Sequence, residues 1–168
     1  MEIEVGKLYS FKIKFRKEKE QVIVVSIGED WILAKNLFDY MIDGYILIYK
    51  NYIHSIVRTD QEIFLENVLR ANNRFNLQYI DIPLATHKLL NWLQETNTVF
   101  QIEPKDESIC YIGYIQSILD KSIRLKPLSY VGTWIDGYDL YRITSLMLLK
   151  FDTDYINSLL TYNRSLDK

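Results

Sequence analysis

The chain has 168 residues, of which 48% are hydrophobic and 25% are charged, a balance typical of globular domains. The formal net charge is −2, and neither half of the sequence is basic. This argues against a protein that binds nucleic acid through charge alone. The lone cysteine, Cys110, excludes a disulfide within the chain and a cysteine-based metal cluster.

The N-terminal residues show no charged-then-apolar signal pattern. No apolar run approaches the ~20 residues that a membrane helix needs. We therefore expect a cytoplasmic protein without a membrane segment.

The first half predicts five short strands and then a helix. Residues 8–16 alternate apolar and polar side chains, as in a strand with one buried face. Apolar runs at residues 21–27, 31–37, 44–50 and 55–58 predict the other four strands. A helix is expected from Asp60, with Thr59 or Asp60 as its N-cap, and it ends at residues 71–73.

The second half predicts the same order of elements with one helix in front. Residues 84–95 carry a leucine-rich apolar set and predict that helix. Strands are expected at residues 99–103, 109–119, 122–128, 138–143 and 146–151. A last helix, capped by Asp152 or Thr153, is expected to run to about Leu160.

A tetrapeptide occurs in both halves: Ile42-Asp43-Gly44-Tyr45 returns 93 residues later as Ile135-Asp136-Gly137-Tyr138. Residues 30–35 match residues 121–126 at an offset of 91, so the second copy has two extra residues in its central loop. Five short strands joined by tight turns are typical of a small barrel. The predicted fold is mainly β with accessory helices, as two tandem five-stranded barrels in domains 1–74 and 75–168, each barrel followed by a helix.

Part of the second half resembles the first sequence motif of the Sm/LSm (Sm-like) family. That motif has a glycine in its second strand, an apolar residue two positions later, an acidic residue near the turn and apolar residues in its third strand. The matching residues are Tyr111-Ile112-Gly113-Tyr114-Ile115, Leu119-Asp120, Ile123 and Leu125. The resemblance implies a small Sm-like (SH3-like) barrel with an N-terminal helix, here residues 84–95.

The resemblance does not extend to the family's RNA-reading residues. Ala34 and Arg124 stand where the family has asparagine, and Val22 stands at the glycine position of the first copy. In the last loop, Arg58-Thr59 and Lys150-Phe151 replace the family's Arg-Gly. The fold is therefore implied, whereas the uridine site is not.

Two groups of residues are candidates for binding. Asp-Gly pairs favour tight hairpin turns, so we interpret both tetrapeptides first as turns. The alternative is that aromatic and acidic residues around them form a shared interaction surface, since Tyr and Trp are enriched at interfaces. Its residues would be Tyr40, Asp43, Tyr45, Trp134, Asp136 and Tyr138.

The second group is a basic stripe, Lys12, Lys14 and Arg16, which would project from one face of a strand at ~7 Å spacing. It could contact phosphates. Lysines on an edge strand also protect it against aggregation, and Glu18 and Glu20 dilute the charge, so a solvated outer face is the alternative.

No catalytic motif, phosphate loop or metal-spaced histidine pair occurs, and His54 and His87 stand apart. The sequence predicts a non-catalytic interaction module, without metal or cofactor, that binds protein or assembles with itself. The alternatives are an Sm-like RNA-binding protein using Lys12, Lys14 and Arg16, an unrecognised enzyme, and a small immunity or inhibitor protein.

Overall fold

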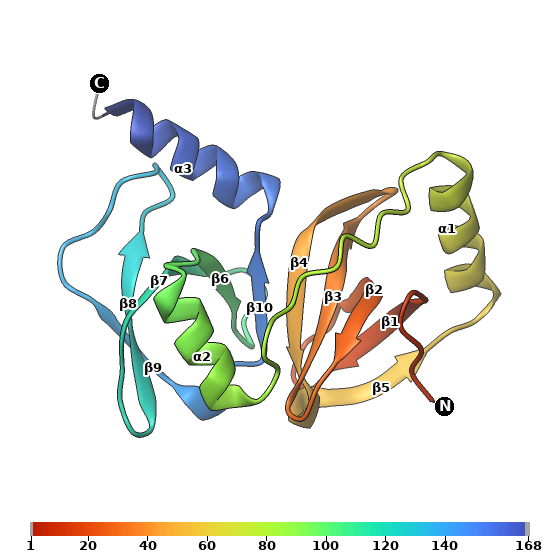
Figure 1. Cartoon of the computed structure of the whole chain (residues 1–168), viewed down its shortest axis with the longest axis horizontal. Coiled ribbons are helices and arrows are strands. Elements are labelled where there is room, and N and C mark those ends of the chain that lie inside the picture. Colours follow the sequence, from red (N-terminus) through yellow and green to blue (C-terminus); the bar gives the residue numbers. More distant parts are fainter. Residues whose placement is uncertain (1, 167–168) are drawn as a thin grey trace.

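The computed structural model describes residues 2–166, which form one antiparallel sheet of ten strands with three α-helices (Figure 1). The strands are β1 Leu8–Ile13, β2 Lys19–Ile27, β3 Trp31–Phe38, β4 Met41–Tyr49, β5 Ile53–Val57, β6 Phe100–Glu103, β7 Tyr111–Ile118, β8 Ser122–Leu128, β9 Asp139–Arg142 and β10 Leu148–Phe151. The helices are α1 Asp60–Ala71, α2 Thr86–Glu95 and α3 Asp154–Leu166, with 3₁₀ turns η1 Lys50–Tyr52 and η2 Ile143–Ser145. No helix in the described residues is long and apolar enough to cross a membrane.

The strand order is β5-β1-β2-β3-β4-β10-β6-β7-β8-β9, so a mainly β fold with accessory helices is confirmed. Each half has the same internal order, and β4 pairing with β10 joins the halves into one open sheet. Two separate closed barrels stay a prediction. So do the domains 1–74 and 75–168, whose outermost residues 1, 167 and 168 lie outside the described part.

The two halves also share their pairing register. Ala34 pairs with Ile46, and at the corresponding offsets Leu125 pairs with Asp139. A register shift interrupts β2–β3 between Val24 and Ser26, and β7–β8 shifts between Ile115 and Ser117. The offsets read from the sequence therefore correspond to equivalent places in the sheet.

The hairpin-turn interpretation of the tetrapeptide is wrong for the first copy. The chain turns at Asp39 and Tyr40, between β3 and β4, while Asp43 and Gly44 lie inside β4 at a register shift opposite Asn36. A β-bulge of the G1 type takes a residue with positive φ, and Gly44 supplies it at +68°. Asp136 and Gly137 lie in a bend that precedes β9.

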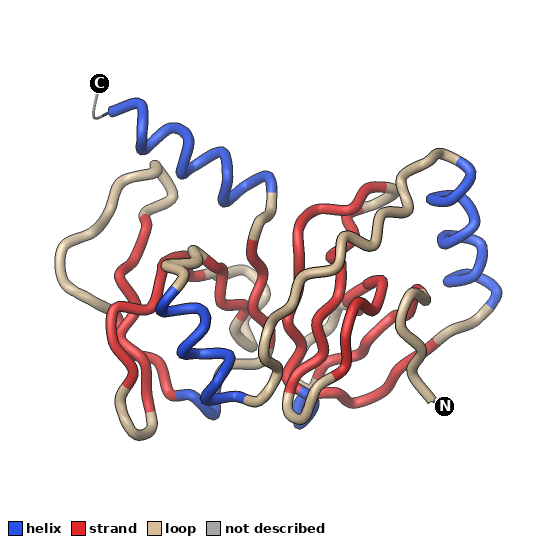
Figure 2. Tube along the Cα trace, in the orientation of Figure 1, coloured by secondary structure: helices blue, strands red, loops and turns tan. Residues whose placement is uncertain are grey.

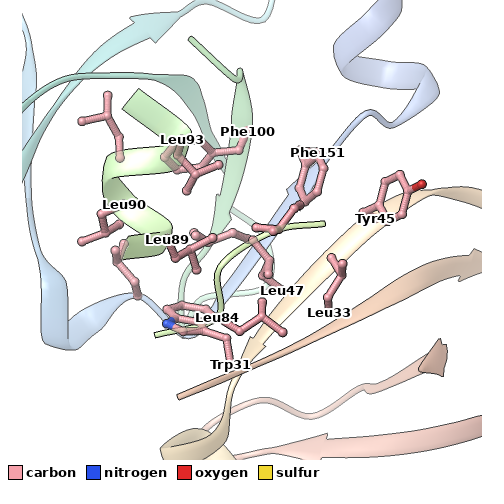
Figure 3. Close-up of a cluster of buried hydrophobic side chains, with 14 of the residues drawn as sticks. Trp31, Leu33, Tyr45, Leu47, Leu84, Leu89, Leu90, Leu93, Phe100 and Phe151 are labelled. Atoms are coloured by element: carbon pink, nitrogen blue, oxygen red, sulfur yellow. The ribbon is translucent and has the colours of Figure 1, made fainter. Parts of the chain in front are cut away.

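The largest buried cluster crosses the boundary between the halves (Figure 3). Trp31, Leu33 and Leu47 of the first half lie in it together with leucines of α2 and with Phe100 and Phe151 of the second. A second cluster covers one face of the first half, and α1 covers Leu8 and Ile23 on the opposite face. Both faces of the first half are thus apolar, as the unbroken run Val22–Val25 in β2 requires.

Helix α1 begins with the expected cap: Thr59 and Glu62 form a capping box. One turn later, the Glu66 carboxylate accepts a hydrogen bond from Leu8 N at 3.1 Å and forms ion pairs with Arg58 and Arg70, each at 3.0 Å. Burial raises the pKa of Glu66, but the hydrogen bonds from Leu8 and Arg70 and the charge of Arg58 outweigh burial, so the net pKa lies below its ordinary value. The ionised carboxylate fastens α1 to β1.

We predict that Glu66→Gln lowers the free energy of unfolding at pH 7 by about 1–3 kcal/mol. Because the folded pKa is depressed, this contribution is complete above the ordinary pKa and is lost as pH falls through the lowered one. Urea unfolding is measured at a series of pH values from pH 7 down to the acid limit. The free energy of unfolding should change less with pH for the variant than for wild type. Glu29→Gln, at an exposed carboxylate, is the control, and parallel curves for wild type and Glu66→Gln would contradict the assignment.

Candidate functional site

The two halves of the sheet meet where β4 pairs with β10, a contact that we call the seam. Leu47 pairs with Leu149, Tyr49 N donates to Met147 O at 2.9 Å, and the rings of Tyr45 and Phe151 stack with centroids 5.2 Å apart. Figure 1 shows β10 beside β4 at the centre of the molecule. The seam therefore joins an edge of one half to a different edge of the other.

The first tetrapeptide is part of the seam. A Cβ placed on Gly44 would lie 2.5 Å from the carbonyl oxygens of both Phe151 and Asp152. The neighbouring Asp43 Oδ1 accepts a hydrogen bond from Asp154 N, at the start of α3, at 2.7 Å. A carboxylate at a helix N-terminus is favourable because it meets free N–H groups and the positive end of the dipole.

The segment before α2 also forms hydrogen bonds across the boundary between the two halves. Leu84 O accepts hydrogen bonds from Asp30 N and Trp31 N, both at 3.1 Å. Asp30 Oδ2 accepts from the hydroxyl and the backbone N–H of Thr86, both at 2.7 Å, and these two bonds hold the pKa of Asp30 below its usual range. The β2–β3 turn of the first half thus holds the N-terminus of α2.

A buried charge cluster completes the boundary. The Arg16 guanidinium donates to Pro104 O at 2.7 Å and pairs with Glu20 at 3.4 Å and Glu103 at 3.3 Å. Lys150 Nζ lies 3.2 Å from the second oxygen of Glu20. Since the side chains of Arg16, Glu20 and Glu103 are at most 10% exposed, these charges depend on one another.

The two outer strands of the sheet, β5 and β9, each pair on one side only within residues 2–166. In β9, Leu140 is 60% exposed. The N–H of Ile143, just beyond β9, donates to Lys121 O beside β8, so strand alternation directs the N–H groups of Leu140 and Arg142 away from β8. An exposed edge of this kind is a template for another strand.

The six residues predicted to form an interaction surface lie in different parts of the structure. Asp43 and Tyr45 lie in the seam, where Tyr45 is buried, so the six do not form one open surface. Tyr40 is exposed in the β3–β4 turn, and Trp134 packs edge-on against Tyr114. The copies Asp136 and Tyr138 lie exposed next to the free edge β9.

The basic stripe does not form a common face, because β1 ends at Ile13 and the chain turns at Phe15, where φ is +70°. Lys12 and Lys14 donate to the backbone carbonyls of Lys17 and Asn51. Arg16 lies in the buried charge cluster. Phosphate contact stays a prediction for the two lysines, whereas the Arg16 guanidinium is already engaged.

Sequence reasoning missed Leu140 in β9 and Ile56 in β5, one apolar side chain on each of the two outer strands. The repeat could have identified them, because at the offset of 93 Leu140 corresponds to Leu47 and Ile56 corresponds to Leu149. Both counterparts are buried in the seam.

Within residues 2–166 no three histidine, cysteine, aspartate or glutamate side chains are grouped as metal ligands would be. His54 lies in β5 and His87 in α2, and both are exposed. No family model, no curated protein and no solved structure matches the chain.

Proposed function

We propose that the chain is a non-catalytic interaction module, built from two tandem Sm-like units, that assembles with itself head to tail through β9 and β5. The observation that carries this proposal is the seam, in which β4 of one half pairs with β10 of the other. By the repeat offsets, β9 is the counterpart of β4 and β5 is the counterpart of β10. The two strand edges that pair inside the chain therefore have counterparts at the two outer edges of the sheet.

The seam supplies the register of the proposed contact. Leu47 lies opposite Leu149 in the seam, so the offset of 93 predicts that Leu140 lies opposite Ile56 of the next copy. Ile46 opposite Lys150 translates into Asp139 opposite Val57. The central pair is apolar, and cross-strand apolar pairs stabilise sheets.

The second tetrapeptide supports the same contact. Gly137 has φ +85°, as unfavourable for other residues as Gly44, yet no described heavy atom comes within 4 Å of its Cβ position. Gly44 needs its open space for the backbone of Phe151 and Asp152. The counterpart of that backbone is Arg58 and Thr59, which a second copy would bring against Gly137.

A contact between two different surfaces is heterologous, so each copy leaves one free edge for the next. Such contacts close into rings if the rotation between copies closes and otherwise extend as filaments. A module of this kind acts by presenting repeated surfaces.

The test is Leu140→Lys, which places a charge at the centre of the proposed contact and leaves every described hydrogen bond of β9 intact. Wild-type protein should show a mass above that of one chain by light scattering, rising with concentration. The variant should be monomeric, with a dissociation constant raised at least about tenfold. Phe64→Lys is a matched control, since Phe64 is 59% exposed on α1 and lines a hollow with Asp39 and Tyr40 of the β3–β4 turn, outside the residues of the proposed contact.

Wild-type protein that is monomeric at every concentration up to the millimolar range would overturn the proposal. So would a Leu140→Lys variant that assembles as well as Phe64→Lys, since the contact would then lie elsewhere.

A further inference from the structure

An open apolar hollow of about 490 Å³ lies at one end of the first half. Ile27 and Ile53 line it, together with Ile32 at its floor, and Ile27 is 39% exposed. Ile3 and the charged residues Glu2 and Lys50 also line it. The hollow is therefore apolar inside, with one charge of each sign beside it.

The same place in the second half is covered. The counterparts of Ile27, Ile32 and Ile53 at the repeat offsets are Ile118, Ile123 and Leu146. Ile123 and Leu146 are fully buried in the cluster that contains the α2 leucines, and Ile118 packs against that cluster. The two halves thus present the same apolar end, closed in one and open in the other.

Helix α2 is what covers the second half, and Figure 2 shows this helix lying against its strands. Its leucines Leu89, Leu90 and Leu93 are all fully buried, at the spacing i, i+1 and i+4 that gives a helix one apolar face. The described residues before β1, Glu2–Lys7, contain no helix, and only Ile3 of this segment packs against the core of the first half.

We propose that the hollow at the end of the first half binds an amphipathic helix of a partner protein, with leucines spaced as in α2. An apolar groove and three apolar side chains on one helical face are the usual elements of helix-in-groove recognition.

The hollow is also continuous with a boundary that already receives a helix. Lys50, which lines the hollow, donates from N to Asp30 O at 2.9 Å and from its ammonium to Gly28 O. This is the turn that binds Leu84 and Thr86. One side of the turn therefore holds the start of α2, and the other side opens on the hollow. The inference does not depend on head-to-tail assembly.

The probe is a synthetic peptide of residues 82–97, which carries α2 and its leading segment, labelled with a fluorophore. Titrating full-length protein into it should give saturable binding with a dissociation constant on the order of 100 µM or tighter. A peptide with Leu89→Asp and Leu93→Asp should not bind. In the protein, Ile27→Asp should weaken binding at least about tenfold, because it places a carboxylate in the hollow.

Ile63→Asp is the matched control, since Ile63 is 40% exposed on α1 and should leave binding unchanged. Circular dichroism and thermal unfolding must show that both variants are folded. Absence of saturable binding to wild-type protein overturns the proposal, as does equal binding by Ile27→Asp. If Ile27→Asp instead lowers the mass of the protein in solution, a second copy covers the hollow and the proposal fails.

Discussion

Replacing Gly44 by alanine is expected to lower the free energy of unfolding by at least about 3 kcal/mol. The left-handed conformation at φ +68° costs alanine roughly 1–2 kcal/mol by itself. The added Cβ would also lie 2.5 Å from two carbonyl oxygens of β10 and the residue after it, so the seam has to open. Chemical denaturation followed by far-ultraviolet circular dichroism measures the loss.

The matched control is Gly137→Ala, at the same position of the second tetrapeptide. Gly137 has φ +85° and no neighbour among the described atoms within 4 Å, so only the conformational cost of about 1–2 kcal/mol is expected. If both variants lose the same stability, close approach at the seam is not the reason for Gly44. Under the proposed assembly, Gly137→Ala should in addition weaken association.

Arg16→Ala is expected to cost about 3 kcal/mol or more, because it leaves two buried carboxylates with Lys150 as their remaining cation. Removing one partner of a buried ion cluster is more destabilising than removing an exposed one, since the remaining charges stay out of water. Differential scanning calorimetry should show one transition at lower temperature. If Arg16 holds the halves together and each half folds alone, that unfolding transition should instead split into two.

Arg74→Ala serves as the comparison, since Arg74 is exposed and donates one hydrogen bond to Tyr40 O at 3.2 Å. A loss below about 0.5–1 kcal/mol is expected there. Similar losses at Arg16 and Arg74 would mean that the buried cluster contributes nothing beyond an ordinary surface contact.

The elements that could be predicted from the sequence are those set by local chemistry. The alternation of residues 8–13 gave β1, and the polar pair Thr59-Asp60 placed the start of α1, where Thr59 is the N-cap. The offsets of 91 and 93 placed equivalent residues of the two halves at equivalent positions of the sheet. Each of these depends on neighbours in sequence or on one repeated pattern.

The site could not be predicted in the same way, because it depends on contacts between distant residues. Asp43-Gly44 suits a turn and a bulge equally well, and the close approach of Phe151 and Asp152 to Gly44 cannot be read from those two residues. The stripe ending at Arg16 continued the alternation of β1, but the turn at Phe15 directs Arg16 into the boundary between the halves. Period-two patterns do not reveal where a strand stops.

The seam also sets the order in which the chain can fold. Paired residues of β4 and β10, such as Leu47 and Leu149, are about one hundred residues apart, whereas all other paired strands join residues about fifty apart or fewer. Contacts of long sequence separation form late, because closing a long loop costs more entropy. On the ribosome, the first half is complete while the bare backbone of β4 still awaits its partner. The time needed to synthesise the remaining residues is therefore a period in which nascent chains can pair with one another.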